Sequence, residues 1–210
     1  LKNNIEPDFV IAIDPNDDNI IYAGGISGGL FNSIDAGNSW NRVQGYDDAV
    51  NDALNGNGSI SISSIAVTDN GYIYVATGGS IFNEQGLSSE SSGITAGDGI
   101  WYSADEGLTF QQVAGTDGKD ITKVVADLNQ ENVIYYSGIS NGVKRVTDLG
   151  SPESMSGLPV TTTGDVKVSV DGQVLITGVS QGGQRSWVSQ DGGASWTDLH
   201  SNGQLVGSGA

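Results

Sequence analysis

An eight-residue pattern that occurs three times is the feature that most limits how this chain can fold. The pattern places Ser, Asp, Gly, Ser or Thr, and an aromatic residue at fixed offsets in residues 33–40, 103–110 and 189–196. An Asp followed two residues later by Gly favours a tight turn, because the carboxylate accepts backbone N–H groups and Gly adopts positive φ without strain. Three copies of one turn indicate a chain that repeats a single supersecondary unit.

A fourth, degenerate copy defines the period of the repeat. Asp105, Asp148 and Asp191 are spaced 43 residues apart, whereas 70 residues separate Asp35 from Asp105. Around Asp148, Gly150 is the only other residue of the pattern that remains. We therefore expect the turn to persist there without the Ser, the Ser or Thr, and the aromatic residue of the other copies. The residues expected to have a structural role in these turns are Ser33, Asp35, Gly37, Trp40, Ser103, Asp105, Gly107, Phe110, Asp148, Gly150, Ser189, Asp191, Gly193 and Trp196.

Two apolar, β-branched segments precede each turn. In the first repeat they are residues 11–14 and 20–24, and similar pairs recur in the other three repeats. With the two strands that flank the Asp turn, they predict four antiparallel strands in about forty residues, which is typical of a β-propeller blade. The predicted fold class is all-β, a β-propeller of four-stranded antiparallel blades, and no segment shows a helical period. We expect one domain over residues 1–210, with blades at about residues 5–45, 59–115, 120–158 and 160–200.

The repeat resembles the Asp-box, or BNR, family of β-propellers, which includes sialidases, sortilin-type receptors, xyloglucanases and photosystem assembly factors. Residues 13–24 and 28–40 are also similar to repeats of large secreted or surface proteins of Bacteroidetes. The resemblance implies an extracellular or cell-surface location in a Gram-negative bacterium, and Asp turns on the face opposite the ligand site. Because most propellers close with more than four blades, we also expect the chain to be part of a larger polypeptide.

The net charge restricts the classes of partner. The chain carries 25 acidic and 8 basic residues, for a net charge of −17 at pH 7. A field of this sign repels polyanions, so nucleic acids and anionic membrane surfaces are poor partners. The sequence has no apolar run of about twenty residues that could insert into a bilayer, and no Cys for disulfides or thiol chemistry. A larger surface complex is compatible with this charge.

Two long polar segments, residues 45–58 and 79–99, interrupt the repeat. In a propeller both connections emerge on the face opposite the Asp turns, and loops of this length are uncommon unless they are functional or disordered. An aromatic side chain beside carboxylates and amides suits a neutral sugar or a protein surface. The candidate ligand-binding residues are Tyr46, Asp47, Asp48, Asp52, Phe82, Glu84 and Asp98.

The acidic residues of the first segment leave a calcium site open as an alternative to a solvated polar segment. They offer several oxygen ligands and no neighbouring cation in that run. Residues 14–19 also begin like a calcium-binding loop, but the later bidentate Glu is missing, which favours a plain polar hairpin. No other cofactor is expected. The oxygen ligands available in the first segment are Asp47, Asp48, Asn51, Asp52 and Asn55.

A glycoside hydrolase is the enzymatic alternative, because several members of the resembled family hydrolyse sugars with paired carboxylates. A sialidase is disfavoured, since it needs several convergent arginines and Arg42, Arg145 and Arg185 fall on predicted strands. The single histidine, His200, offers little to a multi-histidine metal site or a Ser-His-Asp triad. The catalytic candidates, of which no spacing singles out a pair, are Asp47, Asp48, Glu84, Glu90 and Asp98.

The sequence therefore favours a secreted or cell-surface binding or interaction module for a neutral glycan or a protein, rather than an enzyme. A glycoside hydrolase and a structural scaffold in an extracellular assembly remain as alternatives. Saturable binding without turnover supports the module, turnover of neutral polysaccharides supports the hydrolase, and co-purification with envelope proteins supports the scaffold.

Overall fold

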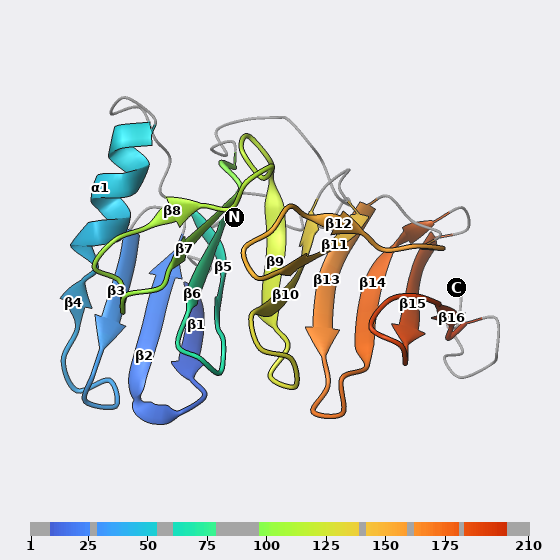
Figure 1. Cartoon of the computed structure of the whole chain (residues 1–210), viewed down its shortest axis with the longest axis horizontal. Coiled ribbons are helices and arrows are strands. Elements are labelled where there is room, and N and C mark those ends of the chain that lie inside the picture. The colour runs from blue at the N-terminus through green and yellow to red at the C-terminus, as the bar shows by residue number, and fades with distance from the viewer. Residues whose placement is uncertain are drawn as a thin grey trace, which may run out of the picture.

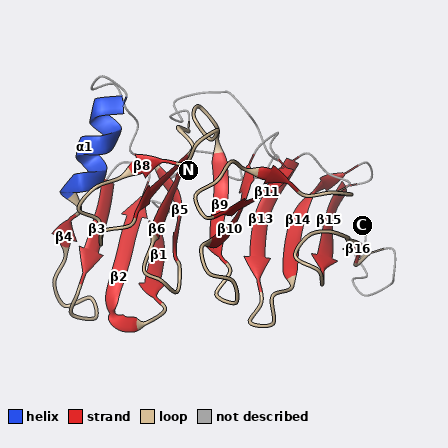
Figure 2. Ribbon diagram, viewed as in Figure 1, coloured by secondary structure: helices blue, strands red, loops and turns tan. Residues whose placement is uncertain are grey.

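Four antiparallel sheets, each of four strands in chain order, make up the computed structural model of the chain (Figures 1 and 2). The structure describes residues 9–25, 29–53, 61–78, 97–138, 142–158, 162–180 and 183–200. The prediction of an all-β fold built from four-stranded antiparallel units is confirmed.

The sheets are numbered 1 to 4 along the chain. Sheet 1 contains β1 (Phe9–Asp14), β2 (Asp17–Gly25), β3 (Gly29–Ser33) and β4 (Asn41–Arg42). Sheet 2 contains β5 (Ile62–Val67), β6 (Ile73–Thr77), β7 (Ile100–Ser103) and β8 (Gln111–Gln112). Sheet 3 contains β9 (Ile121–Ala126), β10 (Val133–Gly138), β11 (Gly142–Thr147) and β12 (Glu153–Ser154). Sheet 4 contains β13 (Thr162–Val168), β14 (Val174–Ser180), β15 (Gly183–Ser189) and β16 (Thr197–Asp198).

The hydrophobic core lies between consecutive sheets. Tyr22 of sheet 1 packs in one cluster with Ile65 of sheet 2, and Tyr74 of sheet 2 packs in the next with Val124 of sheet 3. A third cluster joins sheets 3 and 4. Strand β10 is buried along its whole length because it has a sheet on each side, which explains its continuous apolar sequence. The four sheets form an open row and are not closed into a ring (Figure 1).

One helix, α1 (Gln44–Ala53), follows β4 directly, so the expectation that no segment is helical was wrong. Tyr46 and Val50, one helical turn apart, are fully buried in the same cluster as Leu30 and Phe110. Most other residues of the segment are polar, so the apolar stripe is too narrow to stand out in the sequence. Packing of this stripe on the sheets, rather than helix propensity, stabilises α1.

The three Asp turns, residues 33–40, 103–110 and 189–196, share one hydrogen-bond network. In the second, the Asp105 carboxylate accepts from Ser103 Oγ at 2.8 Å, from the Thr109 amide at 2.9 Å and from Thr109 Oγ1 at 2.6 Å. Ser103 Oγ accepts the Gly107 amide at 2.8 Å, and Gly107 has a φ of 89°. The same bonds recur around Asp35 and Asp191. The repeated residues thus satisfy one another and close the β3–β4 type of hairpin.

The fourth turn closes through the main chain. The Gly150 amide donates to the Thr147 carbonyl at 2.8 Å, and the two residues between them, Asp148 and Leu149, have φ values of 49° and 59°. This is the geometry of a type I′ turn, which suits the twist of a hairpin. The turn persists at Asp148 as expected, but backbone conformation closes it in place of the Ser and carboxylate network.

Acid is expected to weaken the Asp turns. Hydrogen bonds from the side chains and amides of Ser39 and Ser195, and from Ser33 and Ser189, lower the pKa of Asp35 and of Asp191 from 3.8 to about 2. Because the folded-state pKa lies below the unfolded-state value, this stabilisation is present above about pH 4 and is lost as the pH falls towards 2. We expect the melting temperature to fall over this range.

The double variant Asp35→Asn/Asp191→Asn tests this prediction, and thermal unfolding between pH 6 and pH 2 measures it. Its melting temperature should be lower than that of the wild type at pH 6 and should fall less between pH 4 and 2. Asp18→Asn, an exposed position in the β1–β2 hairpin, is the control. Identical slopes in the wild type and the double variant would show that the turns do not cause the acid sensitivity.

Candidate functional site

The Asp turns and the described parts of the predicted binding segments, residues 45–53 and 97–99, lie at opposite ends of the sheets. The Ala36 amide donates to the Asn19 carbonyl at 3.0 Å, which joins the first Asp turn to the neighbouring β1–β2 hairpin. The hairpins β1–β2, β9–β10 and β13–β14 point to the bottom of Figure 1, and α1 extends to the top. The candidate site is therefore built on the end that carries α1 and the connection into β7.

Asp47 of α1 is only 5% exposed and forms an ion pair with Arg42 Nε at the end of β4. The Arg42 guanidinium also lies over the Phe31 ring, 5.7 Å from its centroid. A Cβ at Gly29 would lie 2.9 Å from Asp47 Oδ1, so the ion pair needs the space that glycine leaves. The expectation that the acids of this segment have no cationic partner was wrong, because the start of α1 folds Asp47 back onto Arg42.

Tyr46 is a core residue in this structure. Its ring is fully buried and packs edge-on against Phe110, with centroids 5.4 Å apart. Burial raises the pKa of Tyr46, and the nearby charges of Asp47 and Asp98 raise it further. Its ring therefore does not form the exposed aromatic platform that the sequence suggested. The helical spacing of Tyr46 and Val50 was the signal that could have placed it inside.

Asp48 and Asp52 lie on the opposite, exposed side of α1. Gln44 Nε2 donates to Asp48 Oδ1 at 2.8 Å, and Asn51 is exposed beside them. Residues 44, 48 and 52 are one helical turn apart in succession, so they line one edge of the helix. We call Gln44, Asp48, Asn51 and Asp52 the α1 ridge. It offers carboxylate and amide oxygens to solvent.

Asp98 lies just before β7 and makes three hydrogen bonds that fix the backbone there. Its amide donates to Thr77 Oγ1 at 2.7 Å, its carbonyl accepts Gln112 Nε2 at 2.7 Å, and its Oδ1 accepts the Gly118 amide at 3.4 Å. The glycines on each side, Gly97 and Gly99, approach neighbouring backbone too closely for any side chain. These contacts give Asp98 an evident role in positioning the residues that lead from sheet 2 to sheet 3.

The structure thus brings Asp47 and Asp98 towards Tyr46, and it leaves Asp48 and Asp52 apart on the α1 ridge. Phe82, Glu84, Glu90 and Asn55 lie outside the described residues. Among the residues that are described, no group of three or more His, Cys, Asp or Glu could hold a metal ion.

The three arginines do not converge. Arg42, Arg145 and Arg185 lie on β4, β11 and β15 of three different sheets. Arg145 donates to Gln130 Oε1 at 3.0 Å, and Arg185 forms an ion pair with Asp198 at 2.8 Å. The arrangement does not provide the arginine cluster that a sialidase needs.

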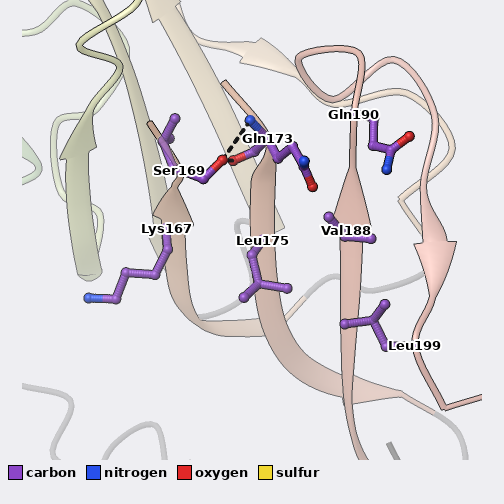
Figure 3. A pocket seen from close by; sticks show the side chains of 8 residues that line it. Lys167, Ser169, Gln173, Leu175, Val188, Gln190 and Leu199 are labelled. Carbon is purple, nitrogen blue, oxygen red and sulfur yellow. Dashed lines mark hydrogen bonds between the residues drawn. The ribbon is translucent and has the colours of Figure 1, made fainter. Parts of the chain in front are cut away.

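Sequence reasoning missed a hollow of about 420 Å³ on the outer surface of sheet 4 (Figure 3). Leu175 of β14, Val188 of β15 and Leu199 after β16 supply its apolar side chains. Lys167, Gln173 and Gln190 are among the polar residues around it. A sequence signal existed, because Leu175 stands where the other three sheets carry a tyrosine.

The described part of the chain has no helix long and apolar enough to cross a bilayer; α1 has 10 residues, half of them polar.

The fold is similar to solved β-propeller structures. No protein-family model and no curated protein sequence matches the chain. An ancestral GH74 enzyme superposes with a TM-score of 0.60 at 19% identity, covering 91% of this chain and 25% of that one. YCF48 from Cyanidioschyzon merolae gives 0.57 at 14% identity, covering 90% and 55%, and YCF48 bound to D1 peptide gives 0.54 at 11% identity, covering 94% and 55%. The extracellular domain of BT4673 from B. thetaiotaomicron gives 0.56 at 16% identity, covering 93% and 22%.

The chain thus spans between about a fifth and about half of the length of these proteins. At identities below 20% the similarity shows the fold alone. The described part of this chain therefore has a β-propeller fold, with four four-stranded antiparallel sheets arranged in an open row.

Proposed function

We propose that the protein is a binding module of the Asp-box β-propeller type, secreted or on the cell surface, that holds a protein or a neutral glycan at the face opposite the Asp turns. One observation carries this proposal: the α1 ridge presents unburied carboxylates and amides at that face, while the acids beside it are already engaged. Asp47 is paired with Arg42, and Asp98 accepts an amide of the following turn.

None of the described carboxyl groups whose pKa is clearly shifted has the raised pKa of a general acid. A glycoside hydrolase needs a general acid whose pKa is raised, held a short distance from a second carboxylate. Among the described residues, the surroundings lower each carboxyl pKa that they clearly shift. The affected residues are Asp17, Asp35, Asp105, Asp171 and Asp191.

The similarity to structures of YCF48, one of which contains a bound peptide, supports a protein partner. The similarity to an ancestral GH74 enzyme keeps a hydrolase as the second candidate. The strongly negative net charge makes a neutral or basic ligand more favourable than an acidic one.

The test combines binding and turnover in one set of samples. Affinity electrophoresis in gels that contain neutral polysaccharides, xyloglucan included, measures glycan binding, and selection from a displayed peptide library measures peptide binding. Release of reducing ends from the same polysaccharides measures hydrolysis. We expect slower migration of the protein in a polysaccharide gel, or enrichment of displayed peptides, without release of reducing ends.

The variant Asp48→Asn/Asp52→Asn should weaken that binding by about threefold to tenfold, because charge-assisted hydrogen bonds from the ridge are lost. The matched control, Asp18→Asn/Asp69→Asn, removes two acids at the Asp-turn end and should bind like the wild type. Release of reducing ends that the ridge variant abolishes would favour the hydrolase. Absence of both binding and turnover would refute the module.

A further inference from the structure

Large apolar side chains are exposed at the end of the sheets that carries the Asp turns. Among the described residues, five of the eight exposed large apolar side chains lie in turns at this end, and the other three lie on strands β1 and β14. Turns usually consist of polar residues and Gly, so apolar residues at these positions need an explanation. The five residues are Ile34, Trp40, Leu108, Leu128 and Val170.

Leu128 and Val170 occupy the same position in two neighbouring hairpins, β9–β10 and β13–β14. Each is the second residue after the first strand of its hairpin, where the β5–β6 hairpin has Asp69. Leu128 is 54% exposed and Val170 is 95% exposed. Leu128 is exposed although its sheet packs against sheet 2 on one side and sheet 4 on the other. The position therefore faces solvent whatever lies beside sheet 4.

Hydrogen bonds join three successive hairpins into one surface. Asn70 Nδ2 of β5–β6 donates to Asn132 Oδ1 of β9–β10, and Asn129 Nδ2 of β9–β10 donates to the Ser169 carbonyl of β13–β14 at 3.4 Å. The β9–β10 and β13–β14 hairpins point to the bottom of Figure 1. We call these three turns the hairpin surface, which consists of residues 68–72, 127–132 and 169–173. Apolar side chains that share a bonded surface are more typical of an interaction site than apolar residues scattered singly.

The hairpin surface is also acidic. It contains four acidic residues and no Lys, Arg or His. Asp69 and Glu131 are exposed, and their side chains form no hydrogen bond or ion pair with any other described residue. Hydrogen bonds from the side chains of Ser169 and Gln173 lower the pKa of Asp171, so this exposed carboxylate also stays charged. Carboxylates beside apolar side chains complement a ligand that has cations beside apolar groups.

We propose that the hairpin surface binds a segment of a partner protein in which Lys or Arg residues alternate with apolar residues. The apolar residues of the segment cover Leu128 and Val170, and its cations pair with Asp69 and Glu131. The net charge of −17 attracts a basic segment, and it disfavours a second copy of this chain, a nucleic acid or an anionic membrane at this surface. The hairpin surface lies at the end opposite the α1 ridge, so this proposal does not rest on ligand binding at the ridge.

Fluorescence anisotropy at low ionic strength tests the proposal with three labelled octapeptides: Lys alternating with Leu, Lys alternating with Ser, and Glu alternating with Leu. We expect the chain to bind the Lys/Leu peptide at least about tenfold more tightly than the Lys/Ser peptide, because burial of apolar side chains adds to the ionic attraction. The Glu/Leu peptide should not bind. Equal affinities for the two basic peptides, binding of the Glu/Leu peptide, or no binding of any peptide would overturn the proposal.

Two double variants separate the apolar and ionic contributions. Leu128→Ser/Val170→Ser should reduce the affinity for the Lys/Leu peptide to that for the Lys/Ser peptide. Asp69→Asn/Glu131→Gln should weaken binding of both basic peptides by about threefold to tenfold. All four side chains are exposed, so circular dichroism and thermal transitions should match those of the wild type.

The matched control is the ridge variant Asp48→Asn/Asp52→Asn, which removes the same charge at the other end of the sheets. It should bind the Lys/Leu peptide like the wild type. An equal loss in the ridge variant and in Asp69→Asn/Glu131→Gln, or unchanged binding in Leu128→Ser/Val170→Ser, would mean that the peptide responds only to net charge and would overturn the proposal. A ligand of the α1 ridge gives the reverse pattern, so failure of this proposal is distinguishable from failure of the proposed function.

Discussion

Gly99→Ala is expected to lower the free energy of unfolding by about 3–5 kcal/mol, because it combines backbone strain with a clash that cannot relax. Gly99 has a φ of 76°, and a Cβ there would lie 2.1 Å from the Thr116 carbonyl oxygen. Thr116 cannot move away easily, since its Oγ1 accepts the Ile100 amide at 3.0 Å and donates to the Val113 carbonyl at 2.7 Å. Urea unfolding followed by tryptophan fluorescence measures the loss.

Gly71→Ala is the matched control for this substitution. Gly71 has nearly the same conformation, with a φ of 80°, but no atom lies within 4 Å of the point that a Cβ would occupy there. Only the strain of a left-handed conformation applies at this position, and we expect a loss of about 1 kcal/mol. Equal losses in the two variants would mean that conformation, and not the close approach to Thr116, makes glycine necessary at position 99.

Tyr46→Ala is expected to lower the free energy of unfolding by about 3–5 kcal/mol, because it removes a fully buried aromatic ring that packs against Phe110. Tyr46→Phe should change stability by less than about 1 kcal/mol, since the Tyr46 hydroxyl is buried and has no hydrogen-bond partner among the described residues. Urea unfolding of the two variants, with hydrogen exchange of the α1 amides, measures both effects.

The comparison of these two variants also connects packing with the proposed function. Loss of the ring should release α1 from the sheets and weaken binding at the α1 ridge, whereas loss of the hydroxyl should leave the ridge in place. A Phe variant as unstable as the Ala variant would show that the hydroxyl makes a bond that holds the helix.

Whether each candidate ligand-binding residue of α1 is buried or exposed depends on contacts that the local sequence does not specify. Asp47 and Arg42 are five residues apart, and only the start of α1 immediately after β4 brings them together. Tyr46 was predicted at a binding face because polar residues surround it, yet burial against Phe110 from another sheet placed it in the core. Asp48 and Asp52 remain exposed because they lie on the other side of the same helix.

By itself, the sequence determined the repeated unit: the Asp turns, the four strands of each sheet and their order. These features are local, because a Ser, Asp and Gly at fixed offsets satisfy one another within eight residues, and alternating β-branched residues favour paired strands. The tertiary structure alone decided which apolar residues are covered. Ile11 and Ile65 are the same residue type at the same register, but among the described residues only Ile65 is buried against a preceding sheet. Burial depends on a neighbour from a distant part of the chain, and a local pattern carries no information about whether that neighbour is there.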